Sequence, residues 1–230
     1  MIDARLLLAL DGDGLDLPPE GIIAVFQPPL DADLPGIDKD RIQIIQGFKP
    51  DYDAWTARGY DVVRNVKDRY AACIVCLPRA KNEARALIAD ACEVCDGIVV
   101  IDGQKTDGVD SILREMRTRV TVRGPISKAH GKMFWISEPA AEFFADWKQG
   151  PSLTDGGFWT APGVFSADGV DLASALLVDA LPENLGSEVA DLGAGWGFLS
   201  AHALTRESIK KIYLIEAGHM ALECARRNVT

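Results

Sequence analysis

The chain of 230 residues is long enough for one large domain or two modest ones, and its 48% hydrophobic and 25% charged residues are typical of a globular protein. No apolar run approaches the ~18 residues of a membrane-spanning helix, and the first residues lack the basic region and cleavage site of a signal peptide. We therefore expect a soluble, cytoplasmic protein with no membrane partner. The net charge of −10 disfavours nucleic-acid binding by the chain as a whole, although a local basic surface can still contact phosphates.

One such local concentration of basic side chains exists, with Glu115 as the only acidic residue within it. We interpret it either as the solvated face of a helix with adjoining strand ends or as a contact for RNA. Its members are Arg114, Arg117, Arg119, Arg123, Lys128 and Lys132.

Two Cys-x-x-Cys pairs, Cys73 with Cys76 and Cys92 with Cys95, have fifteen residues between them, a spacing found in zinc sites. The first pair lies in an apolar run typical of a buried strand, where residues three apart face opposite sides of the sheet. The second pair lies in a helical pattern and shares one face. We therefore expect four core cysteines and no metal site, with a zinc site as the alternative.

The first 150 residues predict alternating strands and helices. A helix over 80–95, for example, is indicated by apolar residues at three- and four-residue spacing. Alternation of this kind predicts βαβ units in a largely parallel sheet. The expected strands are 21–26, 41–46, 72–77, 97–102, 120–122 and 132–137, and the expected helices are 51–59, 80–95 and 109–119.

A segment rich in glycine, proline and serine, residues 146–157, predicts a linker. It divides the chain into a domain over residues 1–150 and a second over 151–230. The second repeats the α/β pattern, with helices at 172–180 and 198–204, strands at 188–192 and 211–215, and the start of a further helix.

The most informative motif runs from Asp191 to Gly197 and reads Asp-Leu-Gly-Ala-Gly-Trp-Gly between a strand and a helix. Such glycines let a ligand approach the main chain at the carboxyl ends of the strands. The pattern differs from the dinucleotide fingerprint G-x-G-x-x-G, and its acidic residue favours a cationic ligand over a pyrophosphate. Glu216 ends the next strand, where it can accept both ribose hydroxyls. A ligand with a ribose, a cationic amino acid and no phosphate is S-adenosylmethionine; a nicotinamide or flavin site, or a fold that binds nothing, remains the alternative.

Two segments carry a family resemblance: APGVFSADGVDLASALLVDALP and VADLGAGWGFLSAHAL. They resemble the small-subunit ribosomal RNA guanine methyltransferases of the RsmC type, and relatives acting on the large subunit share the pattern. The resemblance is strongest over residues 160–228 and looser over 70–150. It implies an α/β protein with two Rossmann-like methyltransferase-type domains and mostly parallel sheets, of which only the second binds S-adenosylmethionine.

The resemblance also implies a role for individual residues. Glu216 would hold the ribose, and methyl transfer to a guanine exocyclic amine in small-subunit ribosomal RNA would be direct and in line. The loop expected to hold the methionine portion comprises Asp191, Gly193, Ala194, Gly195 and Gly197. The segment expected to close over the cofactor contributes Phe165, Ser166, Asp168 and Asp171.

The first domain has Gln-Pro-Pro-Leu at residues 27–30, where the second has its glycines. Proline offers no N–H, and its ring blocks close approach to the main chain. We therefore expect residues 1–150 to bind no cofactor and to act as a scaffold or RNA-positioning domain.

In the RsmC type the acceptor amine is held by an Asn-Pro-Pro-Phe loop after the fourth strand of the catalytic domain, and this chain has none after Glu216. Only 80 residues follow Gly150, against roughly 150 for a complete doubly wound sheet. We expect an incomplete second domain, with acceptor residues beyond Thr230 and no activity in this chain alone. The alternatives are a methyltransferase of a small molecule or protein, and a non-catalytic RNA- or ribosome-binding module.

Overall fold

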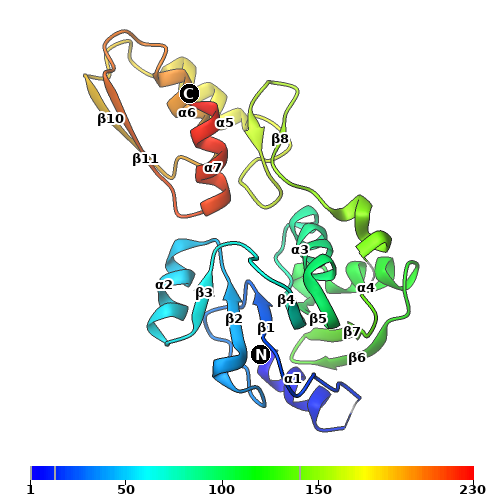
Figure 1. Ribbon diagram of the computed structural model, residues 1–230. Helices are drawn as coiled ribbons and strands as arrows, with labels where there is room; N and C mark the ends of the chain where they lie inside the picture. The colour runs from blue at the N-terminus through cyan, green and yellow to red at the C-terminus, as the bar shows by residue number, and fades with distance from the viewer. Residues whose placement is uncertain (1, 13, 140) are drawn as a thin grey trace. The chain divides into compact units, whose positions relative to one another are not determined.

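The computed structural model describes residues 2–12, 14–139 and 141–230, which form two compact units, residues 1–148 and 149–230 (Figure 1). The boundary between the units lies inside the segment 146–157, whose composition indicates a linker. None of the helices in these described ranges has both the length and the apolar character needed to cross a membrane.

The first unit is built on a seven-stranded sheet in the order β3-β2-β1-β4-β5-β7-β6. The first five strands of that order are parallel, and β7 is antiparallel to both of its neighbours. The order reverses between β1 and β4, which creates a switch point at the carboxyl ends of these strands. The strands are β1 (Ile23–Phe26), β2 (Ile42–Ile45), β3 (Asp61–Val63), β4 (Tyr70–Cys76), β5 (Cys95–Gln104), β6 (Arg123–Lys128) and β7 (Gly131–Ile136).

Helices cover both faces of this sheet, because its strands are apolar on both sides. Buried residues of α3, α4 and η3 pack in one core cluster, and those of α1 and α2 pack in the other. Within β4, Val75 belongs to the first cluster and Ile74 to the second, as strand alternation requires. The helical segments are α1 (Ile2–Leu10), η1 (Lys39–Arg41), α2 (Lys49–Ala57), α3 (Lys81–Val94), η2 (Lys105–Asp107), α4 (Val109–Arg117) and η3 (Ala141–Trp147).

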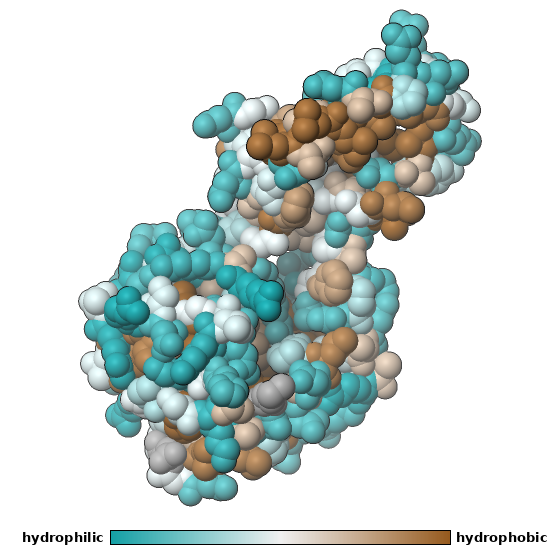
Figure 2. Space-filling view, turned by 180° about the vertical axis from the view of Figure 1, so that it is seen from behind, coloured by the Kyte–Doolittle hydropathy of each residue, from teal (hydrophilic) through white to brown (hydrophobic). Residues whose placement is uncertain are grey.

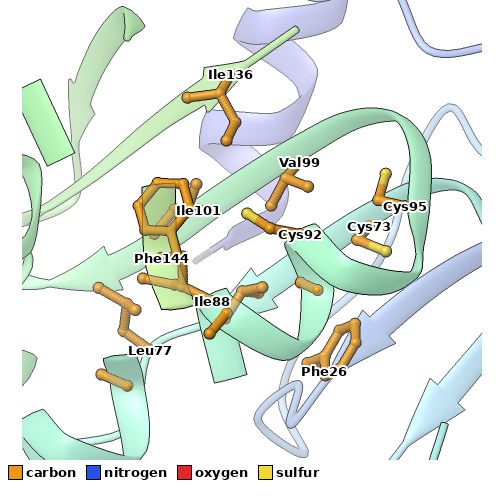
Figure 3. Packing of buried hydrophobic residues seen from close by; sticks show 14 of the residues in the cluster. Phe26, Cys73, Leu77, Ile88, Cys92, Cys95, Val99, Ile101, Ile136 and Phe144 are labelled. Carbon is orange, nitrogen blue, oxygen red and sulfur yellow. The ribbon is translucent and has the colours of Figure 1, made fainter. Parts of the chain in front are cut away.

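Four buried cysteines contribute to these two clusters, and Figure 3 shows three of them, Cys73, Cys92 and Cys95, within the first. Cys73, Cys92 and Cys95 lie in one cluster and Cys76 in the other, so the two members of the first pair face opposite sides of the sheet as predicted. Burial raises the pKa of the Cys92 thiol to about 12, which keeps it protonated at neutral pH. The expectation that these four cysteines pack in the core is confirmed.

Two expectations for the first unit are wrong in detail, and two elements were not predicted. Val120–Val122 is not a strand; β6 begins at Arg123. Helix α2 spans Lys49–Ala57 and not 51–59, because Pro50 is accommodated in the first turn, where its missing N–H has no helical partner to lose. Helix α1 and strand β3 were not predicted from the sequence.

The second unit contains a two-stranded parallel sheet of β10 (Glu188–Leu192) and β11 (Lys211–Ile215). A short hairpin, β8 (Ser152–Leu153) with β9 (Trp159–Thr160), precedes it. The helices are α5 (Leu172–Ala180), α6 (Phe198–Ala203) and α7 (His219–Asn228). The buried core of this unit centres on Ala161, Trp196 and Cys224.

One face of the β10–β11 sheet is exposed. Leu192 is 77% exposed and Ile215 is 54% exposed, whereas the alternate residues of both strands are half-buried. Figure 2 shows a band of hydrophobic side chains over this unit. Leu172 and Leu176 of α5 are also largely exposed.

Candidate functional site

The glycine loop of residues 193–197 joins the end of β10 to the start of α6. Its first two amides, of Gly193 and Ala194, donate to the carbonyl oxygen of Ile215 at 2.8 and 3.1 Å. The loop is thereby attached to the end of β11. It lies at the carboxyl ends of two adjacent parallel strands, which is the location predicted from the sequence.

Two of the loop glycines expose their main chain. Gly193 and Gly195 have φ values of 75° and 54°, and a Cβ added at either would meet no atom within 4 Å. Gly197 is different, because an added Cβ would lie 3.1 Å from both Cα and Cβ of Ala225 on α7. The open main chain at Gly193 and Gly195 suits a ligand, whereas the structure gives Gly197 a packing role against a helix.

Glu216 lies under this loop. Its Oε2 accepts a hydrogen bond from the amide of Gly195 at 2.8 Å, and its Oε1 accepts one from the amide of Gly218 at 2.6 Å. These contacts fix the carboxylate between the two loops that leave β10 and β11. A carboxylate offers about four lone-pair positions, so two remain for hydroxyl donors of a ligand.

Asp191 lies on the half-buried face of β10, where it pairs in register with Leu214. Its Oδ2 accepts a hydrogen bond from the hydroxyl of Ser200 on α6 at 2.7 Å. Ser200 is buried, so this contact holds the carboxylate against the first turn of the helix that follows the loop. The structure therefore brings Asp191 and Glu216 to the same end of the two-stranded sheet, and Glu216 is hydrogen-bonded to the glycine loop.

The segment 161–171 approaches the glycine loop through one main-chain contact. The indole Nε1 of Trp196 donates to the carbonyl oxygen of Phe165 at 3.0 Å, while the Phe165 ring is 69% exposed. Ser166 has a left-handed φ of 53°, and its hydroxyl donates to the carbonyl oxygen of Gly169, across a turn that contains Asp168. Asp171 caps α5 by accepting from the amide of Ser174 at 2.9 Å. Phe165 is thus brought to the loop, while Ser166 and Asp171 stabilise local structure.

The basic residues expected to contact RNA lie on α4, in the turn after it, where Arg119 stands, and on the β6–β7 hairpin of the first unit. Two of them are neutralised: Arg119 pairs with Asp146 at 2.5 Å, and Lys132 pairs with Asp110 at 2.6 Å. The hydrogen bond from Lys132 holds the pKa of Asp110 below its ordinary value, so this pair stays charged at neutral pH. The exposed remainder is Arg114, Arg117, Arg123 and Lys128.

The corresponding end of the sheet in the first unit holds a cavity of about 240 Å³ at the ends of β1, β4 and β5. Arg5 of α1 lines this cavity and forms a bidentate ion pair with Asp102, with Nε–Oδ1 and Nη2–Oδ2 distances of 2.5 and 2.7 Å. Both partners are buried. Pro29 lines the cavity beside Gln27, where the second unit has glycines.

The sequence analysis missed two residues that stabilise the region around the glycine loop of the second unit, Ser200 and Asn228. Ser200 offers only a weak signal, a polar side chain among apolar ones in α6. Asn228 offers none, because its partners are 69 and 32 residues away in the chain.

Comparison with known proteins matches residues 155–230 to the family model described as Methyltransferase small domain. Ribosomal RNA small subunit methyltransferase C of Aeromonas hydrophila is 26% identical over 171 residues, which are 70% of this chain and 50% of that protein. The protein of the same name from Escherichia coli is 39% identical over 98 residues, 42% of this chain and 28% of that protein. The chain spans about half the length of the curated relatives it matches.

A solved structure of the 16S rRNA methyltransferase RsmC of T. thermophilus, in complex with AdoMet and guanosine, has a TM-score of 0.70 to this chain. The match covers 93% of this chain and 63% of that one, at 19% sequence identity. The resemblance and the α/β methyltransferase fold expected from the sequence are confirmed.

Proposed function

We propose that the protein methylates the exocyclic amine of a guanine in small-subunit ribosomal RNA, using S-adenosylmethionine. The match of residues 155–230 to the methyltransferase small domain supports the reaction class. One observation carries the proposal: the main chain of Gly193 and Gly195 is open, Asp191 lies at the end of the strand before it, and Glu216 at the end of the neighbouring strand binds the amide of Gly195. A cationic amino acid joined to a ribose complements these groups. The names of the relatives supply the acceptor class.

In this proposal, different residues of the site bind the cationic end and the ribose of the ligand. Asp191, held by Ser200, presents its carboxylate toward the cationic end of the ligand. Glu216 accepts the ribose hydroxyls with the lone pairs that Gly195 and Gly218 leave free. S-adenosylmethionine, when bound, supplies an electrophilic methyl group, and the protein contributes orientation and exclusion of water.

The acceptor side of the reaction requires groups that hold a planar amine. The 230 residues contain no Asn-Pro-Pro-Phe segment. We therefore assign no catalytic residue within these 230 residues.

The first unit serves the proposed function as a scaffold that positions RNA and binds no cofactor. The buried Arg5–Asp102 pair and the proline-containing turn after β1 stand where the second unit has its open loop. The exposed cations Arg114, Arg117, Arg123 and Lys128 suit a phosphate backbone. A protein that acts on ribosomal RNA would work in the cytoplasm with the small ribosomal subunit as its partner.

Calorimetric titration of the whole gene product with S-adenosylmethionine tests the cofactor assignment. We expect Asp191→Ala and Glu216→Ala each to weaken binding at least tenfold. A matched control is Glu223→Ala, an exposed glutamate of the same unit paired with Arg226. Unchanged affinity in both site variants would contradict the assignment.

Transfer of a labelled methyl group tests the acceptor. We expect label in 16S ribosomal RNA at a guanine exocyclic amine. Label in a small molecule or a protein would support the alternative methyltransferase classes, and RNA binding without transfer would support a non-catalytic module.

A further inference from the structure

The side-chain amide of Asn228, the last residue of α7, binds the main chain of two distant segments. Its Oδ1 accepts from the amide of Trp159 at 2.7 Å, and its Nδ2 donates to the carbonyl oxygen of the same residue at 2.9 Å. The second Nδ2 hydrogen is available for the carbonyl oxygen of Trp196, at 2.7 Å. Asn228 therefore pairs with both main-chain polar groups of Trp159, as a residue of a neighbouring strand would, and also binds the glycine loop.

Trp196 continues this connection. It lies between Gly195 and Gly197, is 4% exposed, and packs its ring against Phe158 and Phe198 with centroids 5.2 and 5.4 Å away. Its indole donates to the carbonyl oxygen of Phe165. Trp196, whose ring is buried, thus binds the segment around Phe165 that is expected to cover the ligand.

A second hydrogen bond connects the end of β9 to the segment that follows it. Thr160 follows Trp159, is buried, and donates from its hydroxyl to the carbonyl oxygen of Ala167 at 2.8 Å. The Thr160–Ala167 hydrogen bond therefore joins the two ends of this segment, and the Trp196 indole holds it at Phe165. Both contacts depend on Asn228, because it binds the main chain of Trp196 directly and the main chain of Trp159, the residue before Thr160.

We propose that Asn228 is a positioning residue of the site, which sets the segment 161–167 against the glycine loop by holding the main chains of Trp159 and Trp196. This inference deepens the proposed function and rests on it for the identity of the ligand. The carbonyl of Trp196 follows directly on Gly195, whose amide binds Glu216. A change in the Trp196 peptide therefore alters the main chain that the ligand approaches.

Only a primary amide meets all three contacts. Alanine leaves the amide of Trp159 and two carbonyls without their partner. Aspartate keeps the acceptor for Trp159 but turns a second carboxylate oxygen toward carbonyl oxygens. The two variants therefore remove the donors in different ways, and both should act in the same direction.

The test measures S-adenosylmethionine affinity and amide hydrogen exchange in the whole gene product. We expect Asn228→Ala and Asn228→Asp to weaken binding at least tenfold and to speed exchange within residues 159–169 and 193–197. The matched controls are Asn184→Ala and Asn184→Asp, since the one hydrogen bond of exposed Asn184 within the described residues comes from the amide of Gly186 in its own turn. We expect the controls to stay within twofold of the wild type.

A second pair of variants separates positioning from folding. Trp196→Phe keeps an aromatic ring in the core but removes the donor to Phe165, so exchange should rise within residues 161–167. Trp159→Phe is its control, because among the described residues the Trp159 indole makes no hydrogen bond and its ring stacks on Arg227. This pair remains informative if the Asn228 variants do not fold.

The outcomes distinguish the two proposals. If the wild type does not bind S-adenosylmethionine, the proposed function fails, and faster exchange in the Asn228 and Trp196 variants still supports the positioning role. Wild-type affinity and wild-type exchange in these variants would overturn the inference while leaving the proposed function intact.

Discussion

The carboxylate of Glu216 accepts a hydrogen bond from the amide of Gly195, 21 residues earlier in the chain and 2.8 Å away. This contact connects the end of one parallel strand to the loop that follows its neighbour. It orients the acid from which a ribose would be held, and it determines how the glycine main chain faces outward. The two residues therefore form one structural unit of the site.

The two kinds of glycine in the loop should respond differently to alanine. Gly195→Ala places a side chain at a φ of 54° in open space, so we expect a loss of roughly 1–2 kcal/mol in unfolding free energy and a marked loss of S-adenosylmethionine affinity. Gly197→Ala adds contact with Ala225, which should cost a further ~1–3 kcal/mol. Urea unfolding and calorimetry on the same samples measure both effects. Equal stability of the two variants would contradict the packing role of Gly197.

Removal of one partner from the buried Arg5–Asp102 pair should strongly destabilise the first unit. Arg5→Ala leaves a buried carboxylate uncompensated, for which we expect a loss of about 3–5 kcal/mol in unfolding free energy. Arg5→Met combined with Asp102→Leu should recover most of it, because no buried charge remains. Lys49→Ala, which breaks an exposed pair with Asp53, is the control and should cost about 1 kcal/mol or less. A small effect of Arg5→Ala alone would show that the pair is dispensable.

Asp90 on α3 should make the first unit less stable as the pH rises. Burial raises the pKa of this carboxyl, Glu93 adds to the rise, and Lys148 opposes it. The folded state therefore keeps the proton to a higher pH than the unfolded state, so stability falls as the pH passes above the ordinary value of 3.8. Asp90→Asn should be more stable than the wild type at pH 7, and the gain should shrink toward pH 4. Urea midpoints across this range measure it; a constant difference would refute the assignment.

The exposed cations of α4 should dominate RNA binding by the first unit. Arg114→Gln and Arg117→Gln should each weaken binding to 16S ribosomal RNA, and each lost phosphate contact should reduce the salt dependence by about 0.7–0.9 in logarithmic slope. Arg226→Gln, in an exposed pair with Glu223 of the other unit, is the matched control. Filter binding at several salt concentrations measures the slopes. Unchanged slopes in both α4 variants would exclude this surface as the RNA contact.

Much of the fold could be predicted because its signals are local. The bounds of α5, β10 and β11 agree residue for residue with expectation, since apolar runs end at turn residues or at a capping aspartate. The same holds for the glycine loop and Glu216, which follow directly from where two parallel strands end. In contrast, β3 has three residues and exists because it pairs with β2, and α1 is held by the contact of Arg5 with Asp102, 97 residues away.

The glycine loop and the acids Asp191 and Glu216 could be identified from the sequence, because strand, turn and helix preferences act over a few neighbouring residues. Which partners hold those groups in place was decided only when the chain folded. Ser200 meets Asp191, the Trp196 indole meets the carbonyl of Phe165, and Asn228 meets two tryptophan peptides. The last two contacts join segments at least 31 residues apart, so they depend on packing in three dimensions, and no spacing along the chain encodes them.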